Sequence, residues 1–438
     1  MAAGSHVIIP RNKKEKNMSK IKESKETLEK YMWAIVGILL SAQLVMSMGA
    51  YAWGPLAPFF RQDFHVTCTQ IGMITSAIYL SATIIALPSG FLVDKLGAKI
   101  VLVFCLSIMG FSFCIMPLAR SFSIIIICSA ASGIGYGMIN QVSIKGIMYW
   151  CTSRTRATAM GIKQAGVTIG GAVVAILLPA MTVSFGWKTG VLAIGLIMLL
   201  MAVAVFIFYR EHPESHAPVS AAAKVKKTDA SLLKTLSNPV LFTIILLIPL
   251  MTFNQVCVTT FWVLYLKEAL NFSISTAGLC LTVAMVSGTV GRIGWGIASD
   301  RFFDGDRLMP LIILSIIGAV SIFFFGIISA KTSLYVFYFL SALVGFTIVG
   351  WNGVYITLAG ELAGTELAGS IMGIIATAGY IGLVAGPIGF GYMVDKVNYF
   401  TGWLSLSVIS MLTAFGFIYI YMRTRKIRMS EKIKSVSL

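Results

Sequence analysis

The sequence predicts an all-α polytopic membrane protein with twelve transmembrane helices in two six-helix bundles related by pseudo-symmetry. Three observations lead to this prediction. Of the 438 residues, 57% are hydrophobic and only 12% are charged, against roughly 25% charged residues in soluble domains. The apolar residues fall into twelve runs, most of them long enough to cross a bilayer. Short motifs in the first six runs recur in the last six.

The twelve runs are joined by short connections, with one exception. The stretch 210–238 contains Pro213, Pro218 and several lysines, a composition typical of a flexible polar linker. It separates six predicted spans on each side. In chain order the predicted spans cover residues 32–58, 70–92, 99–119, 122–149, 157–183, 187–209, 240–266, 274–298, 308–329, 333–360, 367–393 and 400–422.

The net charge of +17 is explained by topology rather than by a nucleic-acid partner. With both termini in the cytoplasm, most of the 34 Lys and Arg residues lie in the inner tails, loops and linker, as the positive-inside rule requires. We therefore predict a multi-pass protein of the plasma membrane, specifically a bacterial inner membrane. Its predicted parts are a cytoplasmic N-terminal tail (1–30), an N-terminal six-helix bundle (31–209), a cytoplasmic linker (210–238), a C-terminal six-helix bundle (239–423) and a cytoplasmic C-terminal tail (424–438).

Other classes of protein are disfavoured by the motifs. Residues 1–30 are polar and the apolar run after them is too long for a signal peptide, so we expect no cleavable signal; Met18 is a second candidate start. The seven cysteines lie mostly in apolar runs and form no CxxC pair, which indicates neither a disulfide framework nor a metal site. HExxH, GxSxG and P-loop motifs are missing. We expect no enzyme activity, no cofactor and no metal.

The two halves carry an internal repeat. The segment Gly90 to Lys95 closes the second span, and a similar segment, Gly296 to Arg301, closes the eighth span 206 residues later. Asn140 recurs 212 residues later as Asn352, as does Met160-Gly161 as Met372-Gly373. Two halves of the same topology imply a pseudo-two-fold axis along the membrane normal, with the substrate between the halves near the midplane.

These motifs resemble those of the major facilitator superfamily, from about Met32 to Arg423. The resemblance implies the major facilitator fold. In that family the loop after span 2 ties spans 2, 3 and 11 together when the protein is open outward, which implies a gating role. A carboxylate there is stabilised by a helix dipole, and a nearby basic residue completes the pair. The matching gating residues are Gly90, Asp94, Lys95, Gly97 and Lys99 in the first copy, and Gly296, Asp300 and Arg301 in the weaker second copy.

Narrower resemblances point to anion carriers. Gly291-Arg292, followed by Gly296 and Asp300, resembles span 8 of oxalate/formate antiporters and monocarboxylate transporters, where the arginine meets the carboxylate. The segment 156–166 resembles span 5 of bacterial cyanate- and nitrate-type permeases. Proton-moving monocarboxylate transporters carry an aspartate one turn before this arginine. Gly288 occupies that position here, so proton coupling by that residue is not implied.

Three basic residues lie within the predicted spans: Lys145, Lys163 and Arg292. No acidic residue lies near mid-membrane, and all four histidines are outside the spans. A buried charge must be paired or hydrated, and an anionic substrate is the simplest missing partner, since the arginine fork suits a carboxylate. The alternatives are that Lys145 snorkels to the cytoplasm, that Lys163 serves packing or gating, and that Arg292 forms an inter-helix pair.

Neutral polar and aromatic residues within the spans are further candidates for the site, although each is equally typical of a contact between helices. Gln43, Tyr51, Trp53, Asn254 and Trp262 are candidate hydrogen-bonding residues of this kind. The predicted substrate-binding residues are Arg292, Lys163, Lys145, Asn140, Gln141, Gln164, Gln255, Tyr265, Asn352, Tyr355 and Tyr380.

The sequence therefore predicts a monomeric secondary transporter, surrounded by membrane lipid, that moves a small organic anion by alternating access. The predicted substrate is a mono- or dicarboxylate, and transport is by proton symport or anion exchange. One alternative is an exporter of hydrophobic or drug-like compounds, whose sites usually contain an embedded acid. A second is a transporter-like sensor, which is expected to carry an additional docking segment.

Overall fold

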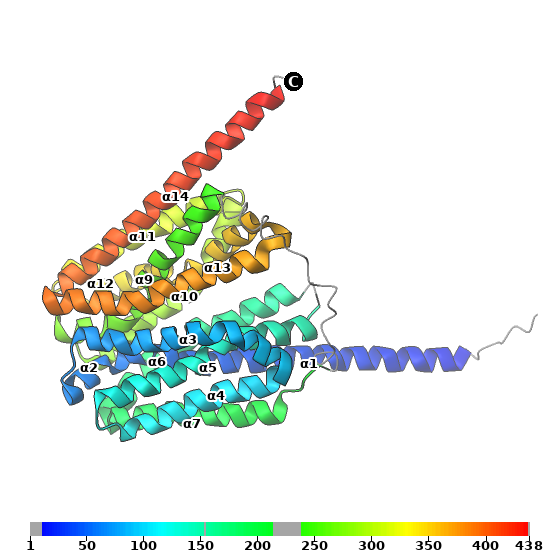
Figure 1. Cartoon of the computed structure of the whole chain (residues 1–438), viewed down its shortest axis with the longest axis horizontal. Helices are drawn as coiled ribbons and strands as arrows, with labels where there is room; N and C mark the ends of the chain where they lie inside the picture. The colour runs from blue at the N-terminus through cyan, green and yellow to red at the C-terminus, as the bar shows by residue number, and fades with distance from the viewer. Residues whose placement is uncertain (1–10, 153–154, 213–237, 437–438) are drawn as a thin grey trace, which may run out of the picture.

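The computed structural model describes residues 11–152, 155–212 and 238–436. Within these residues twelve helices are long and apolar enough to cross a membrane, which confirms the predicted number of spans. They form two bundles of six, one on each side of the linker (Figure 1). Most of the predicted linker, residues 213–237, lies outside the described part of the chain.

The first six spans are built from seven α-helices and one short 3₁₀ helix. A break at Ala52 divides the first span into two helices. In order, the elements are α1 (Arg11–Tyr51), α2 (Trp53–Phe64), α3 (Cys68–Leu96), α4 (Ala98–Ile115), η1 (Met116–Leu118), α5 (Phe122–Trp150), α6 (Arg156–Phe185) and α7 (Trp187–Phe208).

The last six spans contain one irregular helix. The tenth span changes from α-helix to π-helix and back, and α13 then continues into the eleventh span. In order, the elements are α9 (Pro239–Glu268), α10 (Ile274–Phe302), α11 (Leu308–Ile327), α12 (Leu334–Val344), the π-helix η4 (Gly345–Val349), α13 (Asn352–Lys396) and α14 (Tyr399–Val436).

The ends of the chain are helical beyond the membrane spans. α1 begins at Arg11, although the first span begins at Tyr31, and α14 continues to Val436, past the end of the last span at Arg425. Both extensions project from the same side of the molecule (Figure 1). We call this the tail side, and the opposite side, where α3 begins and α9 ends, the far side.

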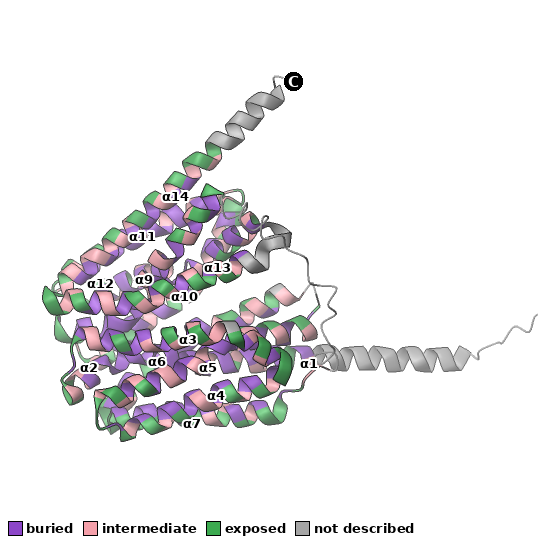
Figure 2. Ribbon diagram, viewed as in Figure 1, coloured by how far each residue is buried: buried purple, intermediate pink, exposed green. Residues whose placement is uncertain are grey.

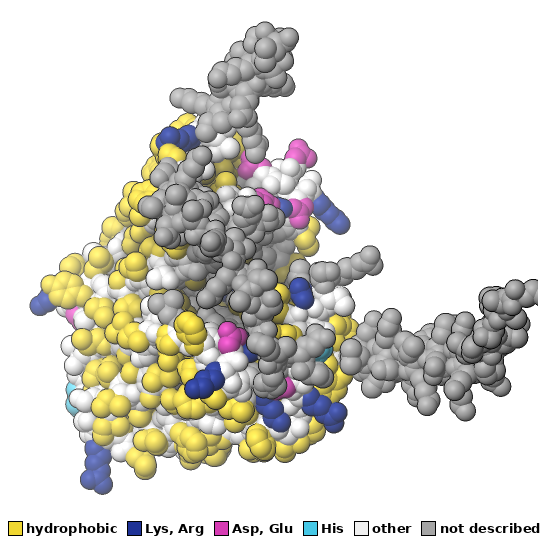
Figure 3. Space-filling view, turned by 45° about the vertical axis from the view of Figure 1, so that its right-hand side comes forward, with side chains coloured by type: hydrophobic (Ala, Val, Ile, Leu, Met, Phe, Trp, Pro, Cys, Tyr) yellow, Lys and Arg dark blue, Asp and Glu magenta, His cyan; other side chains and the backbone are white. Residues whose placement is uncertain are grey.

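Each bundle buries one face of its helices and exposes the other. Buried residues lie where the helices meet, and exposed residues lie around the outside (Figure 2). Many exposed side chains are large and apolar, such as Phe91, Phe206 and Phe302, and hydrophobic side chains cover much of the visible flank (Figure 3). A flank of this kind suits lipid, because lipid tails solvate apolar side chains and the helices satisfy their own backbone groups.

Glycines bring the two bundles into backbone contact on the far side. A Cβ atom on Gly72 of α3 would overlap the carbonyl oxygen of Pro387 in α13, and one on Gly54 of α2 would overlap that of Thr259 in α9. A third contact joins α6 to α10, where a Cβ on Gly278 would lie 2.5 Å from the carbonyl oxygen of Ala175. Helices in a membrane associate by such close packing of small residues, and it holds the far side closed.

A polar cluster reinforces this closure. The Asp395 carboxylate of α13 accepts hydrogen bonds from the backbone N–H groups of Cys68 (2.8 Å) and Thr69 (2.7 Å), at the N-terminus of α3. The free N–H groups and the dipole of a helix N-terminus favour an anion there. Beside it, Arg61 forms an ion pair with Glu268 at 3.0 Å, and the Tyr399 hydroxyl donates to Glu268 at 2.6 Å. The sequence analysis did not foresee this cluster.

We predict that Gly72→Ala destabilises the closed far side. The added Cβ would overlap a carbonyl oxygen on a packed helix, and overpacking of this kind typically costs about 1–3 kcal/mol. The melting temperature of the purified protein in detergent should therefore fall. Gly37→Ala is the control, because a Cβ there meets nothing within 4 Å. Equal melting temperatures for the two variants would contradict the contact between α3 and α13.

Candidate functional site

A cavity of about 270 Å³ lies between the two bundles, next to their far-side contacts. Its wall is largely polar and aromatic and is supplied by both halves. The N-terminal half contributes Gln43, Tyr51, Tyr79, Tyr136, Ile139, Asn140, Gln164 and Val167, and the C-terminal half contributes Ile248, Thr252, Gln255, Arg292, Trp351, Asn352, Ile356, Met372, Ile375, Ala376, Gly379, Tyr380 and Leu383.

Arg292 of α10 is the charged residue in this wall. Its Nε donates to the carbonyl oxygen of Val349 at 3.3 Å. Its Nη1 is buried and has no hydrogen-bond partner among the described residues. Tyr51 and Tyr136, from the opposite half, are the electrostatic neighbours of the guanidinium. The protein therefore holds the guanidinium at Nε and leaves a donor at Nη1 that no described residue uses.

The π-helix explains how Arg292 is held. In η4 the hydrogen bonding is displaced from the α pattern, and single π turns of this kind recur at functional sites. Two carbonyl groups at this turn accept side-chain donors from α10: Val349 accepts from Arg292, and Phe346 accepts from the indole of Trp295 at 3.0 Å. The irregular turn thus supplies acceptors that a regular helix would use internally.

Glycines bring α10 close enough to the π-helix for these bonds. A Cβ on Gly291 would overlap the carbonyl oxygen of Phe346, and one on Gly345 would overlap that of Ala284. At Gly288 a Cβ would lie 2.7 Å from a side-chain carbon of Val349. The aspartate of proton-moving monocarboxylate transporters therefore has no room at position 288 in this packing.

A second feature of the wall is a set of amide side chains. Gln255 of α9 accepts two hydrogen bonds at Oε1, from the Trp351 indole at 2.9 Å and from Asn352 Nδ2 at 3.2 Å. On the opposite half, Lys163 Nζ donates to Asn140 Oδ1 at 2.8 Å. Each of these amides is therefore held by a fixed partner.

The structure brings six of the predicted substrate-binding residues together. Arg292, Asn140, Gln164, Gln255, Asn352 and Tyr380 all line the cavity. Tyr79, Tyr136 and Thr252 also line it and were missed by the sequence analysis. Tyr136 had a usable signal, because it lies four residues before Asn140 and so on the same helix face.

Five other predicted residues lie outside the cavity wall. Lys163 is 1% exposed and lies behind Asn140. The hydroxyl of Tyr265 donates to the carbonyl oxygen of Phe325 at 3.0 Å, and that of Tyr355 to Ile244 at 2.5 Å, so both tyrosines join helices within the C-terminal bundle. Gln141 is not part of the wall, and its Oε1 has no partner among the described residues.

The fifth residue, Lys145, belongs to the first gating motif. Its Nζ donates to the carbonyl oxygen of Val93 at 2.7 Å and lies 3.3 Å from the Asp94 carboxylate. The predicted motif base next to this acid is Lys95, but residues one apart on a helix do not face each other. The lysine that meets Asp94 comes instead from α5, so the motif joins spans 2 and 4 in this state.

Gly97 of the same motif has a structural explanation. It ends α3 and precedes α4 with a φ of 85°, a backbone conformation that glycine adopts at no steric cost. The Lys99 N–H that follows donates to Glu211 at 2.5 Å, near the end of the first half. Gly90 and Gly296 have open space around them, since a Cβ on either would meet nothing within 4 Å.

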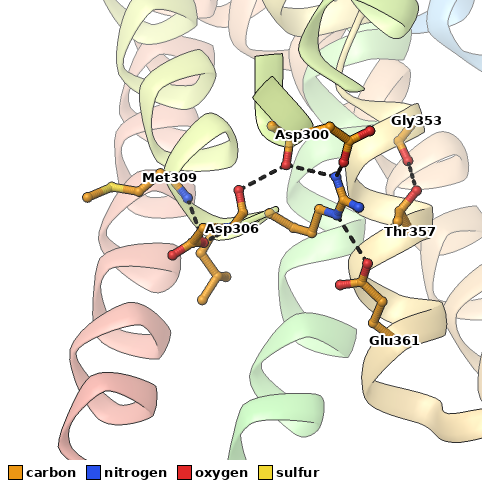
Figure 4. Close-up of polar contacts among 9 residues, drawn as sticks. Asp300, Asp306, Met309, Gly353, Thr357 and Glu361 are labelled. Carbon is orange, nitrogen blue, oxygen red and sulfur yellow. Dashed lines mark hydrogen bonds and ion pairs between the residues drawn. The ribbon is translucent and has the colours of Figure 1, made fainter. Parts of the chain in front are cut away.

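The second gating motif is completed by Arg307 rather than by Arg301. The Arg307 guanidinium is paired with Asp300 of α10 and, at 3.1 Å, with Glu361 of α13 (Figure 4). It also donates to the Ser299 hydroxyl at 3.0 Å. In each half a basic residue ties the acid of the gating motif to a neighbouring span. In the first half Lys145 reaches Asp94 from span 4. In the second half Arg307 bridges acids on spans 8 and 10.

Two six-helix bundles around a central polar cavity define a membrane carrier. A family model described as the Major Facilitator Superfamily matches residues 39–387, and the chain belongs to that family. Membership of this family agrees with the expected fold. It also agrees with the expectation that the protein is not an enzyme, because the family and these similar proteins are transporters. This also confirms the family resemblance predicted from the motifs.

Three of the curated proteins that the chain resembles are bacterial transporters at low identity. A probable sulfoacetate transporter of Cupriavidus necator is 24% identical, covering 83% of this chain and 87% of its own. A hexuronate transporter of Bacillus subtilis is 22% identical, covering 88% and 94%. A probable nitrate transporter of Staphylococcus aureus is 27% identical, also covering 88% and 94%.

Solved structures share the fold. A bacterial homologue of the human lysosomal transporter Spinster, in an inward-facing and occupied conformation, has a TM-score of 0.73 at 15% identity and covers 90% of this chain and 97% of its own. A point mutant of the nucleoside transporter NupG has a TM-score of 0.72 at 13% identity and covers 88% and 100%.

We predict that Lys145→Met leaves anion binding unchanged. Lys145 lies outside the cavity wall. Because substitutions at distant sites act independently, the dissociation constant for the anion should stay within about twofold of the wild-type value. Because the Asp94 side chain is 66% exposed, loss of the pair should cost at most about 1 kcal/mol of stability. Calorimetry measures the dissociation constant, and thermal melting measures the change in stability. A large loss of anion affinity would place Lys145 in the binding site.

Proposed function

We propose that the protein is a secondary transporter that moves a small organic anion across the membrane by alternating access. The observation that carries this proposal is Arg292, a cation in the cavity wall whose buried Nη1 has no partner among the described residues. A cation held in this way inside a membrane protein marks a substrate pathway by default.

The charge of the cavity supports an anion. Among the described residues, no Asp or Glu lines the wall. Lys163, a second basic residue, lies directly behind Asn140. A site for a cationic drug would need an acid here, so this charge pattern disfavours the alternative of a cation exporter.

The size and polarity of the cavity support a small, polar substrate. Pockets for drug-sized ligands span roughly 300–1,000 Å³, and this cavity, at about 270 Å³, is smaller. Amide and tyrosine side chains line part of the wall, beside aliphatic side chains such as Ile248, Ile356 and Leu383. The printed names of three relatives, transporters of sulfoacetate, hexuronate and nitrate, also favour an anion. Arginine's planar fork makes a carboxylate the preferred group.

The arrangement of the bundles suits alternating access. They are in contact on the far side and diverge toward the tail side (Figure 1). With both termini in the cytoplasm, as the distribution of basic residues favours, this state faces inward. We propose that the outward state breaks the far-side cluster around Asp395 and closes the two gating loops on the tail side. The space around Gly90 and Gly296 leaves room for that closure.

The coupling we favour is anion exchange. Among the described residues, neither a carboxyl nor an imidazole group lines the cavity, so neither of the groups that usually carry a coupled proton contacts the substrate. Exchange needs only that the loaded carrier moves and the empty one does not. We propose that the protein works as a monomer in a bacterial inner membrane.

The proposed function predicts that Arg292→Gln abolishes anion binding. Loss of one partner from a buried charge pair costs about 2–5 kcal/mol, so affinity should fall roughly thirtyfold or more. The wild type is first screened by thermal shift against small carboxylates and inorganic anions, and the strongest ligand is then titrated by calorimetry and followed in proteoliposome uptake.

Arg301→Gln is the matched control, because it makes the same substitution at an exposed position on the same helix. It should bind the anion as the wild type does. Normal binding and uptake by a folded Arg292→Gln protein would contradict the proposed function.

A further inference from the structure

The amide side chains of the cavity wall are oriented by hydrogen-bond donors on neighbouring side chains. An amide side chain offers either a carbonyl oxygen or an NH₂ group, and which end lies where is ordinarily assigned from its neighbours. Asn140 and Asn352 occupy equivalent positions in the two halves, 212 residues apart, and both line the cavity with Gln255. Their neighbours leave only one orientation for each.

In the N-terminal half the determining group is Lys163. Lys163 Nζ donates to the Asn140 carbonyl oxygen Oδ1 at 2.8 Å, which fixes the orientation of the amide. The lysine is 1% exposed and lies outside the cavity wall. The end of Asn140 that remains for the cavity is therefore its NH₂ group, a donor.

In the C-terminal half the determining group is Trp351. An indole nitrogen only donates, so the Gln255 atom 2.9 Å from it must be the oxygen Oε1. Asn352 approaches the same oxygen at 3.2 Å and must therefore do so with its own NH₂ group. The other end of Gln255 is its NH₂ group, which has the Tyr51 hydroxyl as a hydrogen-bond partner, and the free end of Asn352 is its carbonyl oxygen, an acceptor.

The two equivalent asparagines thus present opposite polarity to the cavity. Arg292 and Asn140 offer donors, which suit the oxygens of an anion. Asn352 offers a carbonyl oxygen, which needs a donor from the ligand. A simple inorganic anion or an unsubstituted carboxylate has only acceptors and would leave that oxygen without a partner, which costs free energy in a buried site.

We propose that Lys163 and Trp351 are positioning residues that set this polarity, and that the cavity thereby selects a carboxylate carrying at least one hydroxyl group. The carboxylate accepts from Arg292 and from the NH₂ group of Asn140, and the hydroxyl donates to Asn352. Lys163 acts through Asn140 and does not touch the substrate. This inference rests on the proposed function and adds the chemical class of its substrate.

The test compares glycerate with propionate, which share a three-carbon carboxylate and differ in hydroxyl groups. Calorimetry should give the wild type at least a tenfold preference for glycerate, because a site built to bind a hydroxyl rejects the analogue without it. Asn352→Leu should remove the preference by weakening the binding of glycerate. A wild type that binds glycerate no more tightly than propionate, or binds neither, overturns the selection for a hydroxyl.

Lys163→Met tests the positioning role. The variant should lose about tenfold in affinity for both probes and keep its preference for glycerate, because the Asn140 amide is then free to turn. Asn140→Leu should lose the same amount, and the double variant should lose no more than either single one, as coupled residues do. Independent, additive losses, or wild-type affinity in Lys163→Met, overturn the role of Lys163.

Two controls keep these outcomes separate. Removal of a buried ammonium should not unfold the protein, and thermal melting of Lys163→Met checks this first. Arg292→Gln shows whether the proposed function itself holds. If Arg292→Gln loses anion binding while the preference or the coupling is missing, the proposed function stands and the assignment of polarity falls. If Arg292→Gln binds normally, both fall.

Discussion

The structure depends on how a guanidinium is held inside a membrane-spanning bundle. Desolvating a charge is expensive, so the protein must offer it dipoles or a counter-charge. Here the π-helix of the tenth span supplies the Val349 carbonyl, and the glycine contacts at Gly291 and Gly345 bring α10 close enough to use it. Arg292 lines the cavity, and its buried Nη1 has no partner among the described residues. The local fold thus prepares a site for an anion.

Pseudo-symmetry supplies a frame that the two halves fill differently. Asp94 and Asp300 end equivalent helices, yet one meets Lys145 and the other meets Arg307, which also holds Glu361. Asn140 and Asn352 are equivalent too, yet their partners turn opposite ends toward the cavity. A symmetric frame with an asymmetric wall suits a carrier, because the two bundles can rock about one axis while the substrate binds in one orientation.

Much of this was predictable from sequence. Apolar runs and repeated motifs predicted twelve spans and the family, because helix length and backbone satisfaction dominate in lipid. Arg292 was identified because an ionised side chain within a membrane span is energetically costly. Sequence did not reveal that Tyr265 and Tyr355 bond to backbone carbonyls within their bundle, nor that Arg307 rather than Arg301 meets Asp300. Those outcomes depend on helix rotation and on contacts between distant segments, which the spacing of residues along one chain does not reveal.

The central claim is that Arg292 anchors the substrate, and the most direct measurement is an experimental structure of the protein with a bound hydroxycarboxylate. The account predicts density for the carboxylate in the cavity, with its oxygens within about 3 Å of the Arg292 guanidinium nitrogens, the distance of a charge-assisted hydrogen bond. A carboxylate bound elsewhere, for example beside Lys145 and away from Arg292, would contradict the account.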